Sequence, residues 1–358
     1  MRHWFEPNGN GLTPKAALSI KRPPCHAQSN TQRHRFMTNP SWRTNILGAS
    51  CAFGAAMGFS ILELMVKFLS ESYALHQTVF FRAIVGMTAF AIFVMPFQGG
   101  FRVFQTKRLG VHIFRGFCVV AANTCLFLGL ASLPLADAVA IYFVAPLVTA
   151  LLSVIFLRET VGPRRWTAIL IGLFGVMLIV KPGTSAFQLA SIFPMLAATL
   201  YSMMHITARR VSGTESAFTM TAYSNLSFLI VGALVGLSIG WGQFQGTGPE
   251  ELDFLLRPWA TFNPADTIYF ILLGTCGLAA VLLITQAYRI AEASFAAPFE
   301  YVSIPLAIVW GAIFFGTWPD GWSWGGMALI LGSGLYLLWR EAQIGRDSTG
   351  PRGVEDAG

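Results

Sequence analysis

Ionisable side chains within long apolar stretches are the residues of this sequence whose types and spacing could do chemistry. Glu63 and Lys67 stand four residues apart with the acid first, which is the favourable order for an ion pair along a helix. Two interpretations follow. Either Glu63 binds a proton or a cationic group while Lys67 contacts an anion, or the two neutralise each other as a structural pair.

Four more ionisable groups lie within apolar runs. Arg82, in the string FFR, suits either an anion-binding position in a cavity or a contact with helix ends. Glu300, in APFEY, suits proton coupling or cation binding, or else a carboxylate held by a buried Arg or Tyr. His205 could titrate near neutral pH or could serve only in packing. Arg115, near the start of its run, is expected to extend toward lipid headgroups.

Uncharged candidates are amides and phenols, which offer a substrate hydrogen bonds and flat apolar faces. They are Asn123, Tyr142, Tyr223, Gln286 and Tyr301. The alternative for each is a hydrogen bond between helices. Pro146 and Pro305 also lie inside apolar runs, where each removes a backbone hydrogen bond and can kink its helix, so we expect them at gates.

Motifs for other kinds of chemistry are missing from the sequence. None of the five cysteines forms a CxxC pair at metal-ligand spacing, so we expect no metal site. The sequence contains no GxxxxGK[ST] loop and no HExxH. These patterns predict neither an ATP-driven protein nor an enzyme, and they indicate no cofactor.

The elements that position these residues must lie in a membrane. Hydrophobic residues make up 54% of the 358-residue chain and charged residues 11%, against roughly a quarter charged in soluble domains. Apolar runs of the length that a bilayer requires are found ten times. They are 46–68, 75–96, 111–132, 135–157, 165–181, 188–208, 217–240, 266–288, 293–316 and 322–340.

The net charge of +7 indicates a membrane topology, not nucleic-acid binding, because the basic residues gather in alternate loops. The loops on the basic side hold Arg102, Lys107, Arg108, Arg164, Arg165, Arg209, Arg210, Arg289 and Arg340. By the positive-inside rule this side is cytoplasmic, and it also receives both termini. The expected location is a bacterial inner membrane.

The second half of the chain echoes the first. The strings at 140–180 and 298–338 align, and a weaker match joins 58–68 to 200–210. The aligned pairs are Tyr142 with Tyr301, Pro146 with Pro305, and Glu63 with His205. Five spans per copy is an odd number, so the second copy must enter the membrane with reversed polarity, as in inverted-repeat transporters.

These features predict an all-α integral membrane protein of ten transmembrane helices, arranged as two inverted five-helix repeats. The repeats are expected at 45–183 and 184–341, after a cytoplasmic, disordered segment over 1–44 and before a cytoplasmic tail over 342–358. Translation could start at Met1 or at Met37.

With its ten spans and 5+5 repeat, the chain resembles the EamA-type carriers of the drug/metabolite transporter superfamily. The resemblance is carried by Ala-Pro at 145–146, by LRET at 157–160, and by the strings AEASFAAPFEY and SGLYLLWRE of the second copy. It implies secondary-active transport, by alternating access, of a metabolite such as riboflavin, S-adenosylmethionine or an amino-acid-like solute. The expected partners are that substrate, the lipid bilayer and a coupling proton. A drug or metabolite exporter, an intramembrane enzyme and a receptor are the alternatives, and both a monomer and a homodimer stay open.

Overall fold

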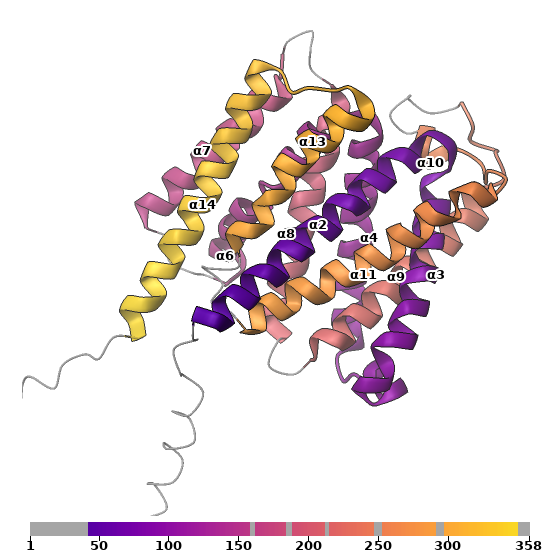
Figure 1. Ribbon diagram of the computed structural model, residues 1–358, viewed down its shortest axis with the longest axis horizontal. Helices are drawn as coiled ribbons and strands as arrows, with labels where there is room; N and C mark the ends of the chain where they lie inside the picture. The colour runs from indigo at the N-terminus through magenta and orange to yellow at the C-terminus, as the bar shows by residue number, and fades with distance from the viewer. Residues whose placement is uncertain are drawn as a thin grey trace, which may run out of the picture. The chain divides into compact units, whose positions relative to one another are not determined.

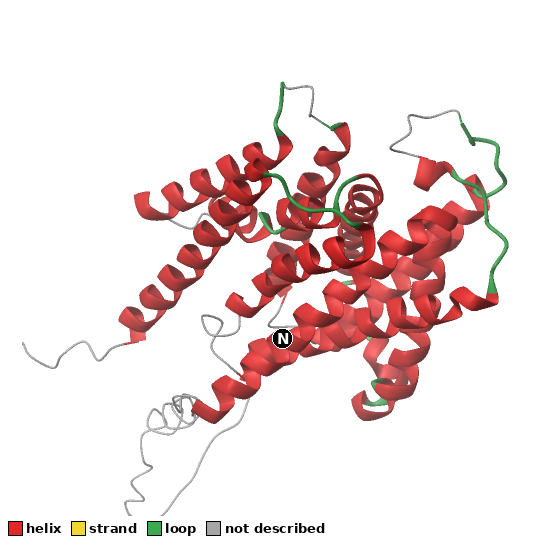
Figure 2. Cartoon of the chain, turned by 45° about the horizontal axis from the view of Figure 1, so that its top comes forward, coloured by secondary structure: helices red, strands yellow, loops and turns green. Residues whose placement is uncertain are grey.

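The computed structural model describes residues 42–157, 162–183, 188–211, 215–246, 253–290 and 297–349. Within these ranges all regular secondary structure is helical (Figures 1 and 2). The predicted all-α class is therefore confirmed. The predictions for residues 1–41 and 350–358, including the start at Met37, lie outside the described residues.

Helices occupy each of the predicted ranges. In chain order they are α2 (Trp42–Ser72), α3 (Leu75–Phe93), α4 (Leu109–Ser132), α5 (Leu135–Tyr142) with α6 (Ala145–Leu157), α7 (Pro163–Val180), α8 (Ile192–Val211), α9 (Ala217–Ile239), α11 (Thr267–Ile290), the 3-10 helix η7 (Ala297–Val302) with α13 (Ser303–Phe315), and α14 (Gly321–Thr349). Two ends differ from the predictions, because the last residues of the segment predicted to be disordered, 42–44, belong to α2, and α14 continues into the predicted tail.

The helices have the length and composition of membrane spans. In the described part of the chain, eight are long and apolar enough to cross a bilayer, and residues 166–180 form a shorter apolar helix. The chain is a multi-pass membrane protein. The count of ten spans stays a prediction.

Local chemistry fixes several helix ends. Ser216 caps α9, because its hydroxyl accepts a hydrogen bond from the backbone N–H of Thr219 at 3.0 Å. Pro163 begins α7, where its missing N–H costs nothing because first-turn N–H groups have no partner within the helix. Lys181 then ends α7 in the left-handed conformation.

Packing between helices follows the same pattern in both halves. Helix α2 packs along α11, and its predicted counterpart α8 packs along α4, the counterpart of α11. Helices α3 and α9 pack together, as do α7 and α14, which run side by side in Figure 1. Glycines permit two of these approaches: a Cβ at Gly58 would lie 3.0 Å from Ala280 Cβ, and one at Gly175 would lie 2.8 Å from Gly326 O. This exchange of partners is what two repeated halves predict.

Two of the spans are not continuous α-helices. The fourth is interrupted at Phe143 and Val144, between α5 and α6, and the ninth changes from the 3-10 helix η7 to α13. Pro146 and Pro305 lie in the first turns of α6 and α13, not in the interior of a continuous helix. Each proline therefore starts the second segment of its span, where its missing N–H is tolerated.

A segment of the connection between α9 and α11 lies across the ends of α2 and α3. Its described part from 253 includes α10 (Asp253–Leu256) and η6 (Pro264–Asp266). Gln77 Nε2 donates to Ala260 O at 2.9 Å, and Ala260 N donates to Gln77 Oε1 at 2.9 Å. Arg257 Nη1 donates to Glu71 O at 2.9 Å. The loop is thus held to this end of the bundle by specific hydrogen bonds.

Candidate functional site

A cavity of about 340 Å³ lies inside the bundle. Its lining comes from α2, α3, α4, α8, α9 and α11, and from the two interrupted spans. Most of the lining is apolar, with a few convergent polar groups, and the volume falls in the range of small-molecule sites.

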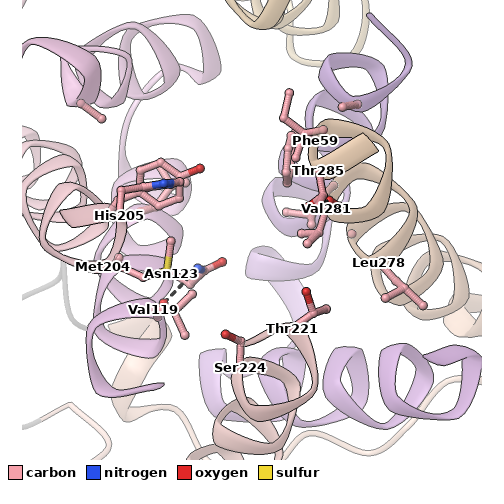
Figure 3. A pocket seen from close by; sticks show the side chains of 18 of the residues that line it. Phe59, Val119, Asn123, Met204, His205, Thr221, Ser224, Leu278, Val281 and Thr285 are labelled. Carbon is pink, nitrogen blue, oxygen red and sulfur yellow. Dashed lines mark hydrogen bonds between the residues drawn. The ribbon is translucent and has the colours of Figure 1, made fainter. Parts of the chain in front are cut away.

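Two helix pairs form facing walls of this cavity (Figure 3). One wall is the α4/α8 pair and the other is the α2/α11 pair, and each pair packs together along its length. Figure 3 shows the first wall at Val119, Asn123, Met204 and His205, and the second at Phe59, Leu278, Val281 and Thr285. Thr221 and Ser224 of α9 lie between the two walls.

Carboxylates belong to the α2 side of the cavity. Glu63 of α2 lines it, is only 5% exposed, and its Oε2 has no hydrogen-bond partner in the described part of the chain. Glu300 also lines the cavity, from η7, which packs against α2. Tyr142 interacts electrostatically with both carboxylates. The α2 side can therefore receive a proton or a cationic group.

Arg82 of α3 lines the cavity as well, but other groups already surround its guanidinium. Its Nη1 donates to Asn123 Oδ1 at 3.0 Å, and Asn123 Nδ2 in turn donates to Val119 O at 3.0 Å. The guanidinium carbon lies 4.8 Å from the ring centroid of Phe228 and 5.7 Å from that of Phe127. These cation–π contacts and the bond to Asn123 hold Arg82 in place.

His205 faces the cavity from α8 within an aromatic group. Its ring centroid lies 4.3 Å from that of Tyr201, which lies 5.5 Å from that of Tyr142. The Nε2 atom of His205 is buried and has no hydrogen-bond partner among the described residues. The structure thus places His205 and its aligned residue Glu63 on opposite walls of one cavity.

Arg115 belongs to the cavity, contrary to the prediction that it extends to lipid headgroups. It is 7% exposed and lines the cavity, and within the described ranges neither Nε nor Nη1 has a hydrogen-bond partner. The sequence does contain a signal for this position. Arg115, Val119 and Asn123 recur at the four-residue spacing that places side chains on one helix face, and all three line the cavity.

Lys67 does not line the cavity, and the ion pair with Glu63 is not formed. Its Nζ donates to Leu130 O at 2.8 Å and to Leu133 O at 2.7 Å, and it lies 5.4 Å from the ring centroid of Phe315. A lysine at this place satisfies carbonyls that the end of α4 leaves without helical partners. The prediction of an anion contact from Lys67 is therefore replaced by a structural role.

Three uncharged candidates also lie outside the cavity lining. The hydroxyl of Tyr223 donates to Phe104 O at 2.8 Å, which is the interhelical alternative given above. Tyr301 is buried, and a Cβ at Gly334 would collide with its hydroxyl, so this ring fills the space beside α14. Gln286 is exposed and does not line this cavity.

The aligned residue pairs are used unequally. Tyr142 and Pro146 of the first half line the cavity, whereas Tyr301 does not and Pro305 is exposed. The repeat thus reproduces the path of the backbone more faithfully than it reproduces the role of each side chain.

The amino-acid sequence of this chain resembles those of known proteins. Residues 46–181 match the model of the EamA-like transporter family. The resemblance predicted from the span 4–5 motifs is confirmed.

Proteins that are similar to this chain over most of its length are named as transporters or exporters. The chain is 28% identical to a riboflavin transporter of Vibrio cholerae, over 84% of this chain and 95% of the relative. It is 24% identical to an S-adenosylmethionine uptake transporter of Rickettsia prowazekii, over 85% and 96%. It is 25% identical to a pseudopaline exporter of Pseudomonas aeruginosa, over 79% and 93%.

One solved structure supports the fold alone. Described only as a crystal structure of protein, it superposes with a TM-score of 0.50 at 16% identity, covering 86% of this chain and 98% of that chain. The arrangement of helices is therefore shared with a protein of quite different sequence.

Proposed function

We propose that this protein is a secondary-active carrier that moves a small organic metabolite across a bacterial inner membrane, with both termini in the cytoplasm. The observation that carries the proposal is the cavity within a membrane bundle, lined by Glu63, Arg82, Arg115, His205 and Glu300. Ionisable groups are costly inside a membrane, and a cluster of them around one cavity suits a substrate pathway. The relatives cited above are all transporters or exporters by name, which favours transport over the enzyme and receptor alternatives.

Alternating access is the mechanism that we propose. The lining reaches Ala217, the first residue of α9, and Thr285, near the last turn of α11, so the cavity extends toward the end of the bundle where α2 begins. The loop that contains Arg257 and Ala260 covers the ends of α2 and α3 on the other side. With the proposed orientation, this is an inward-facing state. Rocking of one half against the other would then open the opposite end.

Substrate and coupling ion are proposed to meet on the α2 side. Glu63 is the proton site of the proposal, because its carboxylate is buried, borders the cavity and has one oxygen without a partner among the described residues. Arg82, Asn123 and Tyr142 are proposed to contact the substrate, since each lines the same cavity. Riboflavin, S-adenosylmethionine and amino-acid-like solutes are the substrate candidates. Relatives named for uptake and for export share the similarity, so the proposal extends to a carrier and assigns it no direction.

The test is transport by the purified protein in proteoliposomes. Labelled riboflavin, S-adenosylmethionine and amino acids are offered with and without a pH gradient. We expect at least one of them to move, and Glu63→Gln to lose accumulation against a gradient while retaining exchange. Glu71→Gln is the matched control, because Glu71 is an exposed acid on the same helix. Failure of every solute to cross would refute the carrier, and gradient-driven accumulation by Glu63→Gln would refute the coupling role.

A further inference from the structure

Arg115 is an unusual group for a protein interior. Nine-tenths of its surface is buried, yet Nε and Nη1 find no acceptor among the residues that the structure describes. A guanidinium stays protonated, and burying it without a partner is unfavourable unless something else compensates. Arg82 provides the contrast within the same cavity, because Asn123 and two aromatic rings already surround it.

The ionisable groups that interact with Arg115 do not supply the missing anion. They are Cys118 on its own helix and His205 on α8. A thiol is a weak acceptor, and imidazole is either neutral or cationic. The α4/α8 wall therefore presents hydrogen-bond donors and positive charge to the cavity, and neither Cys118 nor His205 offers Arg115 a carboxylate.

The α2 side of the cavity lacks a hydrogen-bond donor for one of its carboxylate oxygens. Glu63 Oε2 accepts no hydrogen bond from any residue that the structure describes, and Tyr142 lies in the field of both Glu63 and Glu300. A cavity with an unpaired cation on one wall and an unpaired carboxylate oxygen on the other is complementary to a ligand that carries both charges.

We propose that Arg115 forms an anion subsite that binds the carboxylate of a zwitterionic metabolite, with the ligand's cationic group directed to Glu63. This inference rests on the carrier function proposed above. A planar guanidinium matches the geometry of a carboxylate, and a phosphate dianion would meet the additional repulsion of Glu63 and Glu300. The ligand class is thus a small molecule with a carboxylate and an ammonium or sulfonium group, of a size that fits about 340 Å³.

Ligand-dependent thermal stability of the purified full-length chain tests the subsite. The probes are S-adenosylmethionine, the standard amino acids, the carboxamide of each amino acid, and riboflavin, which carries no carboxylate. We expect at least one zwitterion to stabilise the wild type and its carboxamide to be weaker. Arg115→Gln should weaken that zwitterion by about tenfold to a hundredfold, the range for hydrogen bonds to charged groups.

Matched variants separate binding from folding. Lys107→Gln removes an exposed cation just before α4 and should leave affinity unchanged. Arg115→Lys keeps the charge without the planar fork, so it should bind more weakly than wild type but better than Arg115→Gln. It also serves as the informative variant if Arg115→Gln does not fold. Glu63→Gln should weaken zwitterions and leave the corresponding acids without an amino group unaffected.

Three results overturn the subsite: no carboxylate stabilises the wild type, a carboxamide binds as well as its acid, or the Arg115 variants bind like wild type. The proteoliposome assay distinguishes this failure from failure of the proposed function. Transport of a zwitterion that is unaffected by Arg115→Gln keeps the carrier and removes the subsite. If no probe crosses the membrane, it is the carrier that fails.

Discussion

The two walls of the cavity have the same architecture and different electrostatics. Helices α4 and α8 pack as α11 and α2 do, so each wall is the counterpart of the other. Yet one presents Arg115 and His205 to the cavity, while the other side presents Glu63 and Glu300. The comparison teaches that a repeat can supply matching walls while substitution at aligned positions, as at Glu63 and His205, gives the site a polarity.

Reversing the charge of the basic wall should have the largest effect. Arg115→Glu makes both walls acidic. It removes the proposed charge pair between Arg115 and the substrate carboxylate and adds repulsion between Glu and that carboxylate. Loss of one member of a buried charge pair costs about 2–5 kcal/mol, so transport of a zwitterion should fall at least about thirtyfold. Initial rates in proteoliposomes measure this, and Lys107→Glu controls for net charge. A rate close to that of the control would mean that the walls do not differ in function.

Removing a cation that does not line the cavity should lower the stability of the protein and leave its ligand affinity unchanged. Lys67→Met leaves the carbonyls of Leu130 and Leu133 without their donor, which should cost about 1–3 kcal/mol of unfolding free energy. Denaturant unfolding in detergent measures the loss, with Glu71→Gln as the control. Ligand affinity should stay at the wild-type value, and a fall in affinity at unchanged stability would contradict the structural role.

The two interrupted spans should also differ in how strongly their prolines affect the transport rate. Pro146 lines the cavity and Pro305 does not, so Pro146→Ala should slow transport severalfold while Pro305→Ala changes it less. Alanine restores an N–H that can extend α6 backward and stiffen the interruption. Transport rates at equal amounts of inserted protein decide the matter. Equal rates for wild type and Pro146→Ala would remove the gating role.

The smallest effect is expected at an ion pair outside the cavity, where α7 and α14 meet. The Lys181 ammonium donates to Asp320 and holds the pKa of that carboxyl below its usual range. A depressed pKa stabilises the fold above the unfolded value of about 3.8, and this contribution disappears as pH falls through the folded value. Half of the Asp320 side chain is exposed, so Asp320→Asn should cost under about 1 kcal/mol at pH 7 and nothing near pH 2. Thermal midpoints across pH measure it, and a loss that persists in acid would point to another cause.

The sequence predicts the helices well because apolar runs of membrane length have few alternative structures. It also relates Glu63 to His205, since the internal alignment carries one position onto the other, and the structure has the two residues on facing walls. The sequence does not show which face of each span points inward. In a membrane both lipid and protein neighbours are apolar, so the hydrophobic periodicity that orients a soluble helix is weak. Gln286 and Tyr301 were therefore expected in a cavity that they do not line.

The positions of Arg115 and Lys67 depend on contacts far away in the chain. Lys67 finds its acceptors 63 and 66 residues further along, which no local spacing could indicate. Arg115 lies near the start of α4, where an outward path to headgroups was equally compatible with the sequence. Only the packing of α4 on α8 turns it inward.

The loop that contains Arg257 and Ala260, which is hydrogen-bonded to the ends of α2 and α3, can report on movement of the two halves. It follows α9 of the second half, while its partners Glu71 and Gln77 belong to the first, so separating the halves at this end must break these bonds. The Ala260 amide, which donates to Gln77, would then exchange its hydrogen with solvent at a rate set by opening. Deuterium uptake at one loop amide would thus time the movement of the membrane helices, without any need to know the substrate.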